Sequence, residues 1–185
     1  DMFVKVDADT TIRSKEAFKK AYDLIVKNGA TAIQAPLYDH LSCTNINGLN
    51  IFSTKVLFRT STDNLYCDRV DINNTLILRD KSLPEEFRPI GDHCSRPSDM
   101  QAFHYGLHRT LKKQYELLKS VESAYRNNIA HTTSVISNAK LWALLGSTYA
   151  AHYNEHIGFD YADDKFLNLF EEAKTKFEDF KIKFS

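Results

Sequence analysis

The chain has 185 residues, 43% hydrophobic and 26% charged, which is typical of a folded globular protein and argues against a disordered or fibrous one. Lys plus Arg and Asp plus Glu both number 24, so no charge excess indicates a nucleic-acid or membrane-surface partner. The three cysteines, Cys43, Cys67 and Cys94, are widely spaced, which argues against a disulfide framework or a cysteine-type zinc module and predicts a reducing, cytoplasmic setting. No apolar stretch reaches the roughly 20 residues of a membrane span.

Short β-type segments separated by turn residues occupy the first half of the chain. Residues 3–6 are predicted to form a strand, and residues 15–27 an amphipathic helix that ends at Asn28-Gly29. Residues 31–38 read as a second strand, in which Pro36 indicates a sheet edge or a strand end. This strand–helix–strand order predicts an α/β layer. A turn is expected at residues 45–48, before a short strand at 49–52.

From Pro97 onward the pattern is nearly all helical. Apolar residues at helical spacing predict three long helices, at residues 98–123, 132–153 and 163–184, with Ser98 as the first N-cap. The aromatic residues of the last helix are expected to pack onto the other two, although its lysines also allow a partner-binding or membrane-surface face. These aromatic residues are Phe166, Phe170, Phe177, Phe180 and Phe184. The chain is therefore expected to divide into residues 1–97 and residues 98–185.

Two carboxylates one residue apart, Asp7 and Asp9, follow the first apolar run. In a continuing strand, alternate residues point to the same side, so both carboxylates are predicted to converge at the carboxyl end of the strand. Ligands of open α/β sheets bind there, and two oxygen donors suit Mg²⁺ or Mn²⁺. The competing interpretation is a turn, because Asp commonly closes strands.

A second polar residue of interest is His93, which ends the short segment Arg88-Pro89-Ile90-Gly91-Asp92. A proline and an N-cap serine follow it, so it is predicted to lie at a junction between a strand and a helix, where binding sites are often built. The alternative is a loop histidine without a chemical role.

Taken in order, these motifs resemble the second half of a metal-dependent GT-A glycosyltransferase. The resemblance covers residues 1–113 and rests on the Asp7-Ala8-Asp9 motif, the Asn-Gly-Leu-Asn-Ile-Phe stretch at 47–52, the acidic segment at 68–71, and His93 leading into Ser-x-Pro-Ser and Gln-Ala-Phe-x-Tyr-Gly. It implies a partial GT-A-like sheet with flanking helices in residues 1–97, followed by the helical region. Such enzymes begin with a nucleotide-binding βαβ half, so the chain is expected either to be a fragment that lacks this half or to have it supplied by another chain.

The resemblance also implies a reaction and a set of site residues. Asp9 and His93 would bind Mn²⁺ or Mg²⁺, and Asp7 would bind the metal or the nucleotide ribose of a nucleotide-diphosphate sugar donor. The acceptor would be a saccharide or another hydroxyl compound. Asp68 and Asp71 occupy the place where inverting members keep their catalytic base, and the sequence does not choose between them. The metal would neutralise the charge of the departing diphosphate.

Two other functions remain open from the sequence. His152-Tyr153-Asn154-Glu155-His156 matches the H-x-x-E-H pattern of inverzincin peptidases, in which two histidines bind zinc and the Glu is the base. The other is a non-catalytic α/β module whose helices bind a partner, with the two acids merely closing a strand.

Overall fold

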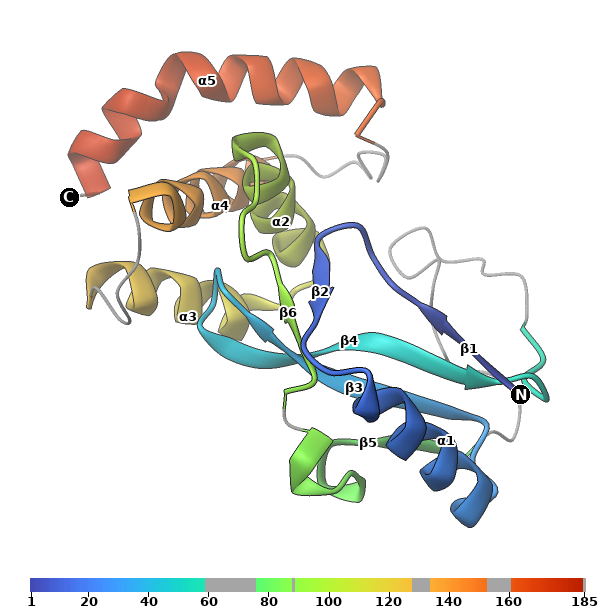
Figure 1. Cartoon of the computed structure of the whole chain (residues 1–185). Helices are drawn as coiled ribbons and strands as arrows, with labels where there is room; N and C mark the ends of the chain where they lie inside the picture. The colour runs from blue at the N-terminus through green and yellow to red at the C-terminus, as the bar shows by residue number, and fades with distance from the viewer. Residues whose placement is uncertain (59–75, 88, 128–133, 153–160, 185) are drawn as a thin grey trace. The chain divides into compact units, whose positions relative to one another are not determined.

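The computed structural model describes residues 1–58, 76–87, 89–127, 134–152 and 161–184 (Figure 1). The fold is α/β, with a mixed sheet and five α-helices in the described ranges. It comprises two compact units. The sheet unit is Asp1–His40 with Thr44–Ser95, and the helical unit is Leu41–Cys43 with Arg96–Ser185.

In the described part of the sheet unit there are six strands, one α-helix and two short 3₁₀ helices. They are β1 (Met2–Lys5), β2 (Thr10–Ile12), α1 (Glu16–Asn28), β3 (Ala32–Asp39), β4 (Thr44–Ser53), β5 (Ile77–Arg79), η1 (Asp80–Ser82), η2 (Glu85–Phe87) and β6 (Gly91–His93). The strand order is β1-β4-β3-β6-β2, and β5 also pairs with β3. Strand β3 runs antiparallel to β4 and parallel to β5 and β6, whereas β2 runs antiparallel to β6.

The expectation that Pro36 marks a sheet edge or a strand end is wrong, because it lies in the central strand β3. The sheet accommodates a residue without an N–H through a register shift between Ala35 and Pro36 in the pairing with β4. On the other side, the carbonyl of Pro36 accepts a hydrogen bond from the Ile90 N–H, with 3.1 Å between N and O. The expected turn at residues 45–48 is also wrong, since these residues belong to the ten-residue strand β4.

Helix α1 covers one face of the sheet. Ala17, Ala21 and Ile25 recur at four-residue spacing and are buried in one core with alternate residues of β3, such as Ile33 and Leu37. Gly29, at φ 62°, ends the helix in the left-handed conformation that favours glycine. The predicted helix at 15–27 is therefore confirmed with its boundaries shifted by one residue.

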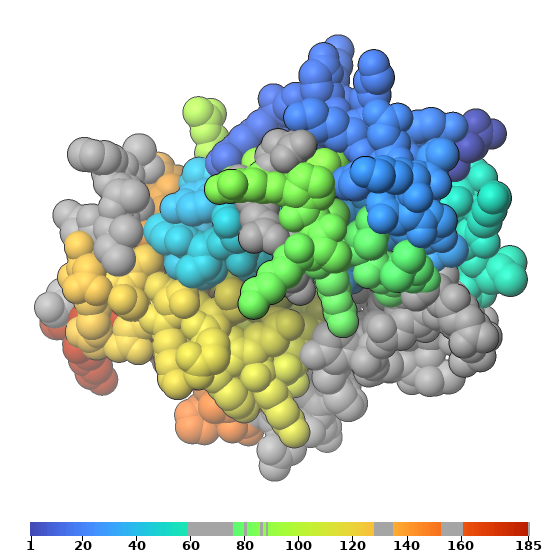
Figure 2. All heavy atoms as spheres, turned by 90° about the horizontal axis from the view of Figure 1, so that it is seen from below, coloured from blue at the N-terminus to red at the C-terminus, as the bar shows by residue number. Residues whose placement is uncertain are grey.

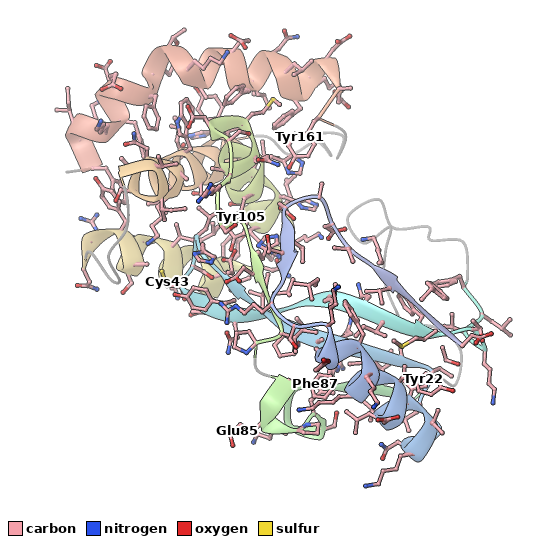
Figure 3. The ribbon with its side chains drawn as sticks, in the orientation of Figure 1. Tyr22, Cys43, Glu85, Phe87, Tyr105 and Tyr161 are labelled. Atoms are coloured by element: carbon pink, nitrogen blue, oxygen red, sulfur yellow. The ribbon has the colours of Figure 1, made fainter. Side chains whose placement is uncertain are left out.

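The segment that carries η1 and η2 completes this core. Figure 2 shows this segment (green) next to the blue surface of α1. Phe87 is 1% exposed and belongs to the same apolar cluster as α1, whereas Glu85 is exposed. Figure 3 labels both side chains, and Phe87 lies on the side of η2 toward α1. The sheet unit therefore has its own hydrophobic core.

The described residues of the helical unit form four helices where the periodicity predicted three. They are α2 (Asp99–Leu111), α3 (Tyr115–Arg126), α4 (Ser134–His152) and α5 (Asp164–Phe184). The predicted helix at 98–123 is interrupted at Lys113, whose φ of 56° is left-handed and cannot continue an α-helix. Ser98 is the N-cap of α2, as expected, and forms a capping box with Gln101.

Helices α2 and α4 cross with their backbones in close contact. A Cβ added at Gly106 would lie 1.6 Å from the carbonyl oxygen of Ala143, and one added at Gly146 would lie 2.1 Å from that of Phe103. Both separations are far below any van der Waals contact. Glycine at these two positions is therefore what permits the crossing.

The aromatic face of α5 packs within the helical unit, as predicted for its first three phenylalanines. Phe166, Phe170 and Phe177 are buried, and Phe177 stacks on Trp142 with ring centroids 3.9 Å apart. Phe166 and Phe170 contact Phe103 of α2 at 6.1 and 5.6 Å between centroids. Packing, and not a membrane-surface face, accounts for this stripe.

Candidate metal site

Strand pairing in the sheet unit brings together residues that are far apart in the chain. Asp9 immediately precedes β2 and Cys94 immediately follows β6, and the two strands are antiparallel with Thr10 opposite His93. The backbone N–H of Cys94 donates to the carbonyl of Asp9 at 3.1 Å. One end of the β2–β6 pair therefore carries Asp9, His93 and Cys94.

The side chains of these three residues converge. The Asp9 Oδ2 atom lies 3.4 Å from His93 Nε2 and 3.3 Å from Cys94 Sγ, and Sγ lies 3.7 Å from Nε2. Asp9 and His93 are half-buried and Cys94 is buried. A carboxylate, an imidazole and a thiol at such distances can hold a divalent metal ion.

A fourth residue, Asp39 at the end of β3, orients the histidine. Strands β3 and β6 are parallel with Asp39 opposite His93, and Asp39 Oδ1 lies 2.7 Å from His93 Nδ1. The carboxylate is fully buried, which makes this charge-assisted hydrogen bond strong. When Nδ1 carries the proton that Asp39 accepts, the lone pair of Nε2 faces Asp9. Such a carboxylate–histidine pair is the usual support of a metal-binding imidazole.

The lone pair of Nε2 and the carboxylate of Asp9 are both acceptors when His93 is neutral. Two acceptors 3.4 Å apart repel each other unless a proton or a cation lies between them. The position between Asp9 and His93 is therefore one that a cation stabilises.

Cys94 reaches the group through an unusual backbone conformation. Its φ is 52°, in the left-handed region that costs a residue with a Cβ about 1–2 kcal/mol. Backbone strain of this kind often occurs at functional sites. No property of the sequence around Cys94 signals this conformation.

The opposite face of the same strands carries an ion-pair cluster. Asp92 alternates with His93 along β6, and it accepts hydrogen bonds from Arg13 Nε at 2.8 Å and lies 2.9 Å from His40 Nε2. The hydrogen bond from Arg13 is the main cause that lowers the pKa of the Asp92 carboxyl, with a smaller contribution from His40. This cluster links the segment after β2 to the ends of β3 and β6, on the face away from Asp9, His93 and Cys94.

The structure separates the two acids of the Asp7-Ala8-Asp9 motif. Both lie outside β1 in the turn to β2, where the Thr10 N–H donates to the Asp7 carbonyl at 3.0 Å, so strand alternation does not govern them. The Asp7 carboxylate is about half exposed and pairs with Lys5 at 3.2 Å, whereas Asp9 joins His93. The expectation that both carboxylates share one side of a strand is therefore wrong: the two acids lie in a turn, and only Asp9 contacts His93.

The other sequence-based candidates are less well placed or lie outside the described residues. Asp68 and Asp71 fall within residues 59–75, and Glu155 and His156 within residues 153–160, neither of which the structure describes. His152 ends α4 and is exposed. The motif analysis found Asp9 and His93 but missed Asp39 and Cys94, whose contribution depends on strand pairing.

The helical unit contains a second histidine pair, His104 and His108 of α2. His104 is 8% exposed and its ring lies against Phe166 and Tyr161, which Figure 3 labels. Burial, with a smaller contribution from Lys112, lowers the pKa of His104 to about 4. The neutral ring is thus part of the aromatic core of the helical unit.

Comparison with known proteins gives no further assignment, because no family model, no curated protein and no solved structure matches the chain. None of the helices in the described ranges combines the length and the apolar character that crossing a membrane requires.

Proposed function

We propose that the protein is a metal-dependent glycosyltransferase that binds a nucleotide-diphosphate sugar through a divalent ion, Mn²⁺ or Mg²⁺, held by Asp9 and His93. The observation that carries the proposal is the 3.4 Å separation of Asp9 Oδ2 and His93 Nε2, with the buried Asp39 on the other nitrogen of the imidazole. A residue that merely closes a strand needs no such partner, and a loop histidine needs no buried carboxylate behind it.

The donor atoms fit an ion that must also bind a diphosphate. Carboxylate oxygens suit Mg²⁺ and Mn²⁺, and a neutral imidazole adds affinity for Mn²⁺ and later first-row metals. A bound ion would supply charge neutralisation for the diphosphate as its bond to the sugar breaks. Asp9 and His93 would bind the ion, and Asp39 would hold the ring proton of His93 on Nδ1 so that Nε2 stays available to the ion.

The remaining chemistry is a proton transfer from the acceptor hydroxyl. A carboxylate on the opposite side of the sugar from the diphosphate can accept that proton as the hydroxyl attacks. Asp68 and Asp71 are the residues proposed for this role, from the resemblance alone.

An activity assay tests the proposal. The protein is incubated with UDP- and GDP-sugars and Mn²⁺, and released nucleoside diphosphate is measured with and without chelator. We expect metal-dependent release that Asp9→Asn and His93→Ala abolish and that Asp7→Asn retains. Asp7→Asn is the matched control because it makes the same chemical change two residues away, at a half-exposed carboxylate outside the cluster. Release that persists in chelator, or equal loss in the Asp7 and Asp9 variants, would contradict the proposal.

A further inference from the structure

The thiol of Cys94 lies about as close to the side chains of Asp9 and His93 as these two side chains lie to each other. Its Sγ atom lies 3.3 Å from Asp9 Oδ2 and 3.7 Å from His93 Nε2, which are 3.4 Å from each other. The three ligand atoms therefore form a nearly equilateral triangle. The motif analysis gave no role to this cysteine.

The distances between these three atoms can be compared with those expected for tetrahedral and for octahedral coordination. With zinc–ligand distances of about 2.0–2.3 Å, tetrahedral angles place N and O about 3.4 Å apart and S about 3.6 Å from either. Right angles, as in an octahedral site, would place the same atoms only about 2.9–3.1 Å apart at those bond lengths. The separations of 3.4 Å between O and N and 3.7 Å between S and N are close to the tetrahedral values, and the 3.3 Å between S and O lies between the two sets.

A purely structural role for the thiol accounts for less of the arrangement. The S–H of Cys94 can donate to Asp9, but a thiol is a weak donor. Nor does this contact explain why the imidazole nitrogen opposite Asp39 also faces the sulfur.

We infer that Cys94, as a thiolate, is the third protein ligand of the ion and makes the site selective for thiophilic metals. This inference rests on the proposed metal site but not on the choice of Mn²⁺ or Mg²⁺, because a thiolate ligand shifts the preference of the site toward Zn²⁺ and similar ions. On binding, the thiol proton is released to solvent and the sulfur bonds to the metal, as metal–cysteine binding requires. Zn²⁺, Co²⁺ and Cd²⁺ should then bind more tightly than Mn²⁺, and Mg²⁺ most weakly.

Three protein ligands in a tetrahedral set leave one position for substrate. That is the pattern of catalytic zinc sites, whereas structural sites use four protein ligands. Among the described residues, the group that can hold a metal has three members, Asp9, His93 and Cys94. The fourth position would be taken by an oxygen of the donor diphosphate.

Cobalt spectroscopy tests the inference without an activity measurement. The starting protein carries Cys43→Ser and Cys67→Ser, so that Cys94 is the only thiol among the three cysteines of the sequence. Co²⁺ is titrated with and without UDP or GDP while near-UV thiolate-to-cobalt absorption and visible cobalt bands are recorded. The matched variant adds Cys94→Ser, which keeps the size of the side chain and replaces sulfur with oxygen.

We expect near-UV absorption in the starting protein and its loss in the Cys94→Ser variant, which still shows visible cobalt bands. The affinity for Cd²⁺ should fall at least about tenfold in that variant, since loss of a residue that only supports a metal ligand already lowers metal affinity about 10–100-fold. Visible bands without the near-UV absorption in the starting protein would overturn the role of Cys94 and leave the Asp9–His93 site standing. No cobalt binding in either protein would overturn the metal site itself, and the role of Cys94 with it.

Discussion

Replacing Asp39 by asparagine should weaken binding of the divalent ion about tenfold, although Asp39 does not touch the ion. The buried carboxylate lies 2.7 Å from His93 Nδ1 and makes a charge-assisted hydrogen bond. Loss of such support for a metal-binding imidazole typically costs about 10–100-fold in metal affinity, or about 1.4–2.8 kcal/mol. A difference of about 1.4 kcal/mol is a tenfold change in affinity.

The amide also removes the control over the imidazole tautomer. Its NH₂ group can donate to Nδ1, which moves the ring proton to Nε2, the atom that faces Asp9. The expected loss therefore extends toward the upper end of the 10–100-fold range for residues that support metal ligands.

Calorimetric titration of Mn²⁺ and Co²⁺ measures the affinity, and ¹⁵N NMR of the His93 ring reports the tautomer. Asp92→Asn is the matched control, because it changes the neighbouring carboxylate, which contacts Arg13 and His40 on the other face of β6. Wild-type affinity and an unchanged ring tautomer in Asp39→Asn, with binding lost in Asp9→Asn, would refute the positioning role of Asp39.

Three further predictions concern stability. Gly106→Ala should lower the free energy of unfolding by about 3 kcal/mol or more, because its Cβ would overlap the Ala143 carbonyl, and urea denaturation measures the loss. Arg13→Gln should raise the pKa of Asp92. Above about pH 4 the variant should be less stable than wild type. This difference should vanish as the pH falls through the lowered pKa of Asp92 in the wild type, as NMR and denaturation can show. The unfolded chain binds a proton at His104 between pH 6.5 and 4 that the folded chain does not, so stability should fall by about 3 kcal/mol over that range, and His104→Phe should remove this dependence.

Local periodicity predicted the elements whose residues interact with their sequence neighbours. The helix α1 was predicted within one residue because its small apolar residues recur at helical spacing and Gly29 ends it. Continuous apolar spacing could not reveal the break at Lys113, since a left-handed lysine leaves no mark in the pattern. The Asn-rich segment at 45–48 has turn residues, but pairing with β3 holds it in a strand.

The candidate site was predicted only in part for a similar reason. Asp9 follows an apolar run and His93 ends a short extended segment before a helix N-cap, so each was identified from its local sequence. Asp39 and Cys94 gain their positions from the parallel pairing of β3 with β6 and from a left-handed backbone. Neither feature is encoded in a short motif, because strand pairing depends on long-range contacts.

The most direct test of the account is whether this protein binds a diphosphate through a metal held by Asp9 and His93. Inorganic pyrophosphate, UDP and GDP are titrated calorimetrically into the protein with Mn²⁺, with Co²⁺ and with neither, and the titrations are repeated on Asp9→Asn, His93→Ala and Asp7→Asn. We expect diphosphate binding that requires the metal, persists in Asp7→Asn and is lost in the other two variants. Metal-independent binding, or binding that survives both Asp9→Asn and His93→Ala, would contradict it.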